Sequence, residues 1–412
     1  MSKERGRDRT ITFDINQMLY SMSSVLDMVE KELLGVTTDH SKRVAYLCIK
    51  MGKTLSYTDR QLAALACCAV MHDSALTEYL HDEQLGAGRS SDGVIDHRAH
   101  CLAGERNISV IPMDPLVKEA VLYHHEEADG GGAFGKTAAE TPMPAQLIHL
   151  ADQMDSAFDL AEMTEDKCDR IHAYLWDQTG ILFAPEVTDL FSRSVSRGEL
   201  FTLRRDRIDE LLFSQLPTLY QTYSNEQLMR LATVFARIID YKSPFTRAHS
   251  LGVAGKARCM GAYYGMDGEM QAKLFFAGAV HDVGKLAVQS DVLEKPDRLT
   301  GAEYIAVQNH AYASYLVLHR IRGLDDVAAW AYLHHEKLDG SGYPFGLKGD
   351  KLNREERLLA CLDIYQALVE ARPYKDGMNH EQAIHIMRDM VCRGKIDPEI
   401  TEDIAECFSS MA

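Results

Sequence analysis

A repeated pattern of histidines and aspartates constrains the fold of this chain more than any other feature of its sequence. The matched pairs are His40 and His249, His72-Asp73 and His281-Asp282, His100 and His310, His124-His125 and His334-His335, and Asp152 and Asp363. The distance between the members of a pair stays between 209 and 211 residues. So constant an offset indicates that one domain occurs twice in the chain. The pattern uses ten of the 17 histidines, which explains most of the histidine content.

The apolar residues of both copies follow the periodicity of helices. Segments 59–71 and 268–280 carry apolar residues nearly all round, which is typical of buried helices. No segment shows a convincing alternation of apolar and polar residues. We therefore predict an all-α fold of two tandem helical bundle domains, at 1–200 and 223–412, with a helical linker at 201–222.

The charge and the apolar runs of the chain exclude several classes of protein. With 44 Lys and Arg against 61 Asp and Glu, the net charge is −17, which argues against a partner such as a nucleic acid polymer or an anionic membrane. The longest apolar run, 62–71, is far shorter than the ~20 residues that span a bilayer. The charged N-terminus is followed by no signal-peptide core, so we expect a cytoplasmic protein.

The second copy offers a ligand set that suits two metal ions. Imidazole and carboxylate groups together bind Fe, Mn, Zn or Ni. Neighbouring helical residues point about 100° apart, so an adjacent His-Asp pair can face two ions. Two ions ~3.5–4 Å apart are the usual device for hydrolysing phosphate esters. The candidate ligands are His249, His281, Asp282, His310, His334, His335 and Asp363.

Three motifs in the second copy belong together. They are HDVGK at 281–285, HHEKLDGSGYP at 334–344 and DIYQALVEARPYK at 363–375. With them, residues of about 225–405 resemble the HD-GYP domain of the HD phosphohydrolase superfamily. The resemblance implies an HD-GYP catalytic domain at 223–412 and an HD-type domain without the GYP motif at 1–200. It also implies a phosphodiesterase that hydrolyses a cyclic dinucleotide, chiefly cyclic di-GMP, to a linear dinucleotide or mononucleotides.

The resemblance also assigns roles to single residues. It supports the seven ligands and two divalent ions, with Fe or Mn favoured, which activate a hydroxide for attack on phosphorus. Asp282 would bridge the ions, and Lys285 would hold a phosphate oxygen. Arg372 and Lys375 would grip the phosphodiester, for which bidentate arginine is well suited. Gly342 and Tyr343 belong to the GYP loop beside the metals.

Two departures from the family pattern bear on the metals and on the substrate. Members with three metals resemble one another in a Glu four residues before the first histidine, where this chain has Phe245, so we expect two metals. The family often has an Asp, implicated in guanine recognition, where this chain has Gln366. A neutral amide at that position keeps cyclic GMP–AMP open as the substrate.

The first copy keeps the ligand types but loses the residues that would hold a phosphate. Leu76 replaces the lysine, HHEEADGGGAF replaces the GYP motif, and nothing after Asp152 resembles RPYK. Three interpretations stay open: a regulatory or structural metal domain, a second hydrolase with another substrate, and a scaffold without metal. The candidate ligands of the first copy are His40, His72, Asp73, His100, His124, His125 and Asp152.

Two other functions compete with the cyclic-dinucleotide phosphodiesterase. One is an HD phosphohydrolase that acts on another nucleotide, against which the GYP motif of the second copy speaks. The other is a receptor that binds a cyclic dinucleotide without hydrolysing it, against which the full ligand set and Lys285 speak. A homodimer is compatible with a long helical chain, but no motif specifies it.

Overall fold

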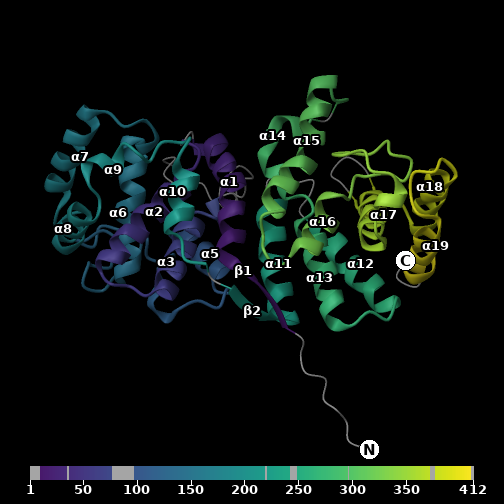
Figure 1. Ribbon diagram of the computed structural model, residues 1–412, viewed down its shortest axis with the longest axis horizontal. Coiled ribbons are helices and arrows are strands. Elements are labelled where there is room, and N and C mark those ends of the chain that lie inside the picture. Colours follow the sequence, from purple (N-terminus) through teal and green to yellow (C-terminus); the bar gives the residue numbers. More distant parts are fainter. Residues whose placement is uncertain are drawn as a thin grey trace, which may run out of the picture. The chain divides into compact units, whose positions relative to one another are not determined.

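The computed structural model describes residues 10–34, 37–76, 97–218, 220–241, 248–295, 297–371 and 376–409. These residues form two compact units. The N-terminal unit contains residues 15–218, and the C-terminal unit contains residues 10–14 and 220–409. Both units consist of helices, apart from one pair of short strands, so the predicted all-α class is confirmed (Figure 1).

The N-terminal unit is built around one helix, α2, which packs against α3, α6 and α10. A capping box at Thr58 and Gln61 begins α3, whose residues from Leu62 onward are buried. The helices are α1 (Ile15–Leu34), α2 (His40–Thr54), α3 (Asp59–Met71), α5 (His97–Ile108), α6 (Met143–Phe158), α7 (Glu165–Gln178), α8 (Pro185–Ser194), α9 (Arg197–Leu200) and α10 (Ile208–Gln215), with 3₁₀ turns at Pro115–Val117 and Leu160–Glu162.

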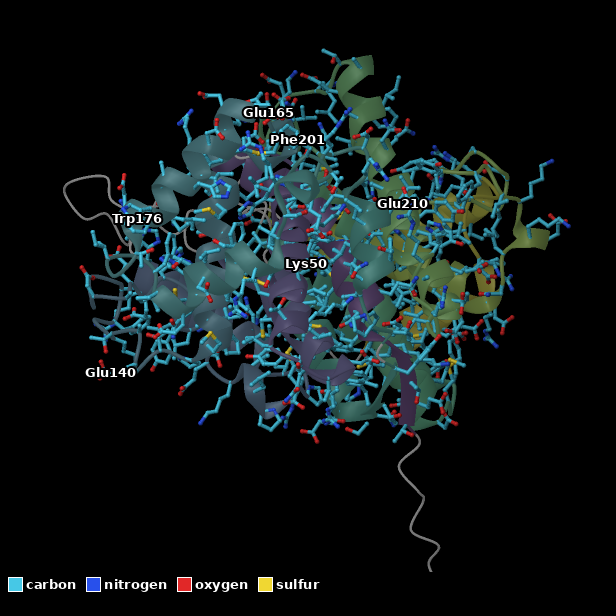
Figure 2. The ribbon with its side chains drawn as sticks, turned by 60° about the vertical axis from the view of Figure 1, so that its left-hand side comes forward. Lys50, Glu140, Glu165, Trp176, Phe201 and Glu210 are labelled. Atoms are coloured by element: carbon cyan, nitrogen blue, oxygen red, sulfur yellow. The ribbon has the colours of Figure 1, made fainter. Side chains whose placement is uncertain are left out.

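Ion pairs hold the short helix α9 on the surface of this unit. Lys50 of α2 lies 2.6 Å from Glu199. Arg197 lies 2.6 Å from Asp169 and also pairs with Glu165. Figure 2 labels Lys50 and Glu165. These side chains are at least a quarter exposed, so each pair contributes little, typically ~0–1 kcal/mol. Leu200 of α9 is buried, so apolar packing as well as the ion pairs holds this helix in place.

The C-terminal unit repeats this arrangement around α12, which packs against α13 and α17. Its helices are α11 (Asn225–Asp240), α12 (His249–Tyr263), α13 (Gly268–Val280), α14 (Ser290–Leu293), α15 (Gly301–Leu318), α16 (Asp325–Tyr332), α17 (Arg354–Val369), α18 (His380–Cys392) and α19 (Pro398–Cys407), with 3₁₀ turns η3 at Val283–Ala287 and η4 at Gly349–Lys351. Gly278 lets α13 approach α12 closely, because a Cβ atom there would lie 2.8 Å from the Cα atom of Ala254.

A two-stranded antiparallel sheet belongs to the C-terminal unit. Strand β1 (Thr10–Asp14) pairs with β2 (Tyr220–Ser224), and the buried rings of Phe13 and Tyr223 stack at 4.7 Å (Figure 1). The expectation of no strands was wrong here, and the helical interpretation of 201–222 holds only for Ile208–Gln215. Each strand is five residues long, and the two strands lie more than 200 residues apart in the sequence. A pattern of apolar and polar residues over so short a segment does not reveal such a pairing.

No helix in the described part of the chain is both long and apolar enough to cross a bilayer.

Candidate metal centres

The C-terminal unit brings all seven predicted ligands of the second copy to one place. They come from the start of α12, the end of α13, the middle of α15, the segment after α16 and the middle of α17. Four of the five histidines are no more than 3% exposed. We call this set the C-terminal cluster; it consists of His249, His281, Asp282, His310, His334, His335 and Asp363.

Asp282 lies at the middle of the C-terminal cluster and presents its two oxygens to different histidines. Its Oδ2 atom lies 3.2 Å from His281 Nε2 and 3.9 Å from His249 Nε2. Its Oδ1 atom lies 3.3 Å from His310 Nε2 and 3.8 Å from His334 Nε2. A carboxylate placed in this way can bridge two cations.

Two groups of donor atoms stand on either side of Asp282. In one group, Asp363 Oδ1 lies 3.1 Å from His249 Nε2 and 3.7 Å from His281 Nε2. In the other, one nitrogen each of His310, His334 and His335 lies within 4.8 Å of the other two. The arrangement thus provides two adjacent centres that share one carboxylate.

Hydrogen bonds to the backbone orient three of these histidines. The Nδ1 atoms of His281, His310 and His334 lie 2.7, 2.5 and 2.6 Å from a carbonyl oxygen three residues earlier. Donation from Nδ1 leaves the lone pair on Nε2. Among the described residues, no hydrogen-bond partner meets any of the three buried Nε2 atoms or Asp282 Oδ1. Buried polar atoms without partners are costly, so these donors fit a bound divalent ion.

Burial and the charges within the cluster shift the pKa values of its ligands in different directions. Burial and the charge of His281 lower the pKa of His334 to about 3, so its ring is neutral. Burial alone would raise the pKa of Asp282, but His281 and Lys285 hold it well below its usual range. Burial would lower the pKa of His281, but Asp282 and Asp363 raise it to about 10. A cation that binds His281 must therefore displace a proton.

Lys285 lies against the carboxylate of Asp282. It stands in the 3₁₀ turn η3, in which residues three apart lie on the same side. Its Nζ atom is 2.5 Å from Asp282 Oδ2, so it is aligned with Asp282. The positively charged ammonium group of Lys285 thus lies beside the candidate metal ligands.

The GYP loop is held against the paired histidines. Glu336 accepts hydrogen bonds of 2.8 Å from the backbone N–H groups of Phe345 and Leu347. A Cβ atom on Gly342 would lie 2.5 Å from the carbonyl oxygen of His335, so glycine is required there. The ring of Tyr343 lies 4.6 Å from the ring of His335, which places it at the edge of the centre.

Glu370, which was not predicted from the sequence, orients the first histidine. Its Oε2 atom lies 2.9 Å from His249 Nδ1. Gln366, one helical turn earlier, is buried, and its Oε1 atom accepts a hydrogen bond of 2.5 Å from Lys256. In the sequence, the signal that could have revealed Glu370 is a glutamine at 366 followed, one helical turn later, by a glutamate at 370. The predicted residues Arg372, Lys375 and Phe245 lie outside the described residues.

The N-terminal unit assembles its predicted ligands in the same way. Asp73 Oδ2 lies 3.5 Å from His72 Nε2, and Asp73 Oδ1 lies 3.5 Å from the Nε2 atoms of His100 and His124. On the far side of Asp73, His40 Nε2 is 3.2 Å from Asp152 Oδ1. We call this set the N-terminal cluster; it consists of His40, His72, Asp73, His100, His124, His125 and Asp152.

The loop of the N-terminal unit follows the path of the GYP loop although its motif is missing. Glu126 accepts hydrogen bonds of 2.5 Å from the N–H groups of Phe134 and Lys136. A Cβ atom on Gly132 would lie 2.4 Å from the carbonyl oxygen of His125. The buried Leu76 stands where the C-terminal unit has Lys285. The N-terminal unit therefore lacks the lysine but keeps the loop that packs against the paired histidines.

Comparison with known proteins agrees with this geometry. One HD domain family model matches residues 233–400, and a second matches residues 37–157. The chain is a tandem HD domain protein. HD domains depend on metal ions, and the donor groups of both units fit such ions. The predicted family is thereby confirmed, and with it the class of phosphodiesterase hydrolase.

Several relatives of this tandem HD domain protein are known. It is 28% identical over 400 residues to 3′3′-cGAMP-specific phosphodiesterase 1 of Vibrio cholerae, across 95% of this chain and 91% of the relative. It is 24% identical to 3′3′-cGAMP-specific phosphodiesterase 3 of the same organism, across 97% and 94% of the two chains. A cyclic di-GMP phosphodiesterase of Pseudomonas aeruginosa is 32% identical, over 38% of this chain and 37% of its own.

A solved structure shares the fold. The crystal structure of a cyclic GMP-AMP specific phosphodiesterase from V. cholerae matches with a TM-score of 0.65 and 21% identity, over 97% of this chain and 98% of the other.

Proposed function

We propose that the protein hydrolyses 3′3′-cyclic GMP–AMP to a linear dinucleotide at the C-terminal cluster. The observation that carries the proposal is the position of Asp282, whose two oxygens face two separate groups of histidines. Two divalent ions in these groups would activate water for attack on phosphorus and neutralise charge on the phosphate oxygens. Fe or Mn fits the ligand set, as the family resemblance suggested.

The residues of the chain itself hold and orient the phosphodiester. Lys285 Nζ is close enough to Asp282 to place its charge on a phosphate oxygen bound at the shared centre. Tyr343 and the loop around Gly342 cover the side of the cluster formed by His335. Arg372 and Lys375 stay in the proposal as the residues predicted to grip the phosphodiester.

The organisation of the relatives supports the choice of substrate. The two relatives that match nearly the whole tandem chain are named as specific for 3′3′-cGAMP. The cyclic di-GMP phosphodiesterase of P. aeruginosa matches little more than a third of the chain. The sequence alone favoured cyclic di-GMP, with cyclic GMP–AMP as the alternative. The shared tandem organisation and the neutral Gln366 support the alternative.

Hydrolysis of a panel of cyclic dinucleotides by the full chain tests this proposal. Protein loaded with Mn²⁺ or Fe²⁺ should cleave cyclic GMP–AMP faster than cyclic di-GMP. Asp282→Asn should abolish cleavage, and the exposed Asp291→Asn, a matched change on α14, should leave it unchanged. If metal-replete protein binds either compound without cleaving it, the protein is a receptor and the proposal fails.

The cytoplasmic location and the homodimer remain predictions from the sequence.

A further inference from the structure

A cysteine lies next to the N-terminal cluster and has no counterpart next to the C-terminal cluster. Cys101 directly follows His100 in α5, and the matching residue after His310 in α15 is Ala311. Both side chains are fully buried. The two clusters therefore differ in a donor atom at one defined position.

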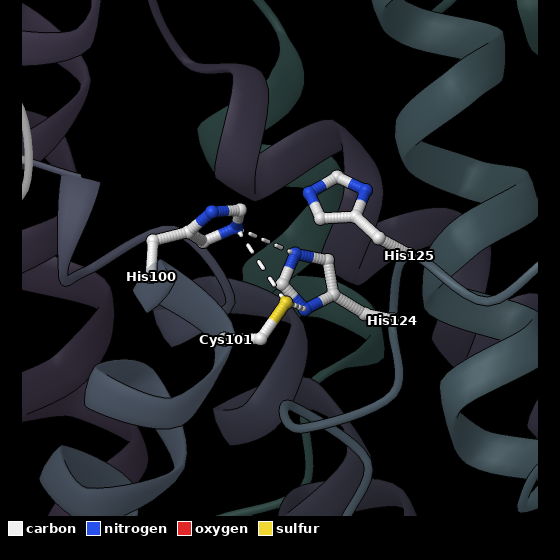
Figure 3. Close-up of side chains that lie close together, drawn as sticks. All are labelled: His100, Cys101, His124 and His125. Atoms are coloured by element: carbon white, nitrogen blue, oxygen red, sulfur yellow. Dashed lines mark hydrogen bonds between the residues drawn. The ribbon is translucent and has the colours of Figure 1, made fainter. Parts of the chain in front are cut away.

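The sulfur of Cys101 lies among the histidines of the N-terminal cluster. Its Sγ atom is 3.8 Å from His100 Nε2 and 3.8 Å from His124 Nδ1 (Figure 3). One donor atom each of Cys101, His100, His124 and His125 lies within 4.8 Å of the other three. Zn–S and Zn–N bonds of ~2.3 and ~2.0–2.1 Å place two tetrahedral ligands roughly 3.6 Å apart, which is close to the 3.8 Å between Cys101 Sγ and His100 Nε2.

Several neighbouring polar atoms lack a partner in the same way as those of the C-terminal cluster. Within the described part of the chain, nothing hydrogen-bonds to the buried His72 Nε2 or Asp73 Oδ1. The nitrogens His100 Nε2 and His124 Nε2 face each other at 3.4 Å, both 3.5 Å from Asp73 Oδ1. These nitrogen and oxygen atoms lie close together and can all donate a lone pair, which is the environment that binds a cation.

We propose that Cys101 is a ligand of a metal ion in the N-terminal unit, together with His100, His124 and His125. A thiolate among imidazoles selects a borderline-soft ion such as Zn²⁺. Cys101, His100, His124 and His125 fill the four positions of a tetrahedral ion, whereas the matching C-terminal group offers the three histidines His310, His334 and His335. Structural metal sites use all their positions for protein ligands, and catalytic sites keep one open. The thiolate therefore makes this centre a closed, structural one.

The test is the absorption spectrum of the full chain loaded with Co²⁺. A cobalt–thiolate bond gives a charge-transfer band that cobalt–imidazole and cobalt–carboxylate bonds do not give, and the C-terminal groups contain no cysteine. Wild-type protein should show the band. Cys101→Ala should lose it, and Cys168→Ala, a buried cysteine of α7 outside both clusters, should keep it.

Two further variants keep the test decisive if Cys101→Ala folds poorly. Cys101→Ser preserves the size of the side chain and should also lose the band. Ala311→Cys adds the same donor to the C-terminal cluster and should strengthen the band while reducing hydrolysis. The proposal is overturned if the wild type lacks the band, or if the band persists in the folded Cys101 variants.

Discussion

Glu370 accepts a hydrogen bond from His249 Nδ1 at 2.9 Å, whereas His40 donates the matching bond to Asp155 at 2.7 Å. The two carboxylates belong to equivalent helices, Glu370 to the end of α17 and Asp155 to α6. When the two copies are aligned, Glu370 lies one helical turn after the position that matches Asp155. The position of Asp155 corresponds to Gln366, which cannot supply a charge. The two units thus orient their first histidine by the same contact from different positions.

This contact predicts that Glu370 tunes the metal affinity of the C-terminal cluster. Outer carboxylates fix the orientation and basicity of a histidine ligand, and their loss typically costs ~10–100-fold in metal affinity. Glu370→Ala should weaken metal binding by that factor in a competition titration with a chelating dye. Glu381→Ala, on the exposed face of α18, is the control. Equal affinities of the two variants would show that the contact does not act on the metal.

A buried ion pair in the N-terminal unit has been replaced in the C-terminal unit. Arg43 donates to Asp155 through Nε at 2.6 Å and Nη2 at 2.9 Å, and both side chains are buried. The matching residues are Gly252 and Gln366, and a Cβ atom on Gly252 would lie 2.3 Å from the Gln366 amide. The N-terminal unit therefore pairs arginine with aspartate at these two positions, and the C-terminal unit pairs glycine with glutamine.

This exchange predicts a strong coupling between Arg43 and Asp155. Arg43→Gly should destabilise the N-terminal unit by about 3–5 kcal/mol, because the buried carboxylate of Asp155 loses its permanent positive charge and keeps the hydrogen bonds from His40 and the Leu160 N–H. The double variant Arg43→Gly with Asp155→Gln removes that charge and should regain part of the loss. Urea unfolding of the four proteins gives the coupling energy. Simple additivity of the two changes would contradict the prediction.

The close approach of Gly342 to the paired histidines predicts a strict requirement for glycine. A Cβ atom there would lie within 2.4–2.5 Å of backbone atoms of residues 335–337, which cannot move without moving the ligands. Gly342→Ala should therefore lower both stability and hydrolysis, with a loss of roughly 1–3 kcal/mol in unfolding free energy. Gly301→Ala, where a Cβ atom meets nothing within 4 Å, should leave both unchanged or raise stability.

Asp240 predicts a dependence of stability on pH. Burial raises the pKa of this carboxyl to about 7, although it accepts a hydrogen bond from Ser250 at 2.6 Å. The folded state then holds a proton that the unfolded state releases near its ordinary pKa of 3.8. This linkage favours folding below about pH 4 and is lost as the pH rises to about 7.

Asp240→Asn should remove this dependence while keeping the contact with Ser250. Urea midpoints of chelator-treated protein at several pH values between 4 and 7.5 measure it. Wild-type stability should fall relative to the variant across this interval. Parallel curves for the two proteins would mean that the carboxyl does not hold the proton.

The sequence predicted what depends on residue type and spacing. The histidine and aspartate repeat revealed two equivalent units, and the HDVGK and GYP motifs identified the unit that keeps Lys285, the residue predicted to hold a phosphate. Helical periodicity was enough for the class of fold, because the buried helices have long apolar stretches such as 62–71.

The sequence by itself determined the set of candidate ligands, because each candidate is tied to a position in a repeated motif. Only the tertiary structure decided which other side chains reach them. Glu370 and Cys101 act through contacts with residues of other helices, and β1 pairs with a strand more than 200 positions away. Such contacts depend on how helices pack and where side chains point, and neither the spacing nor the composition of a segment records that.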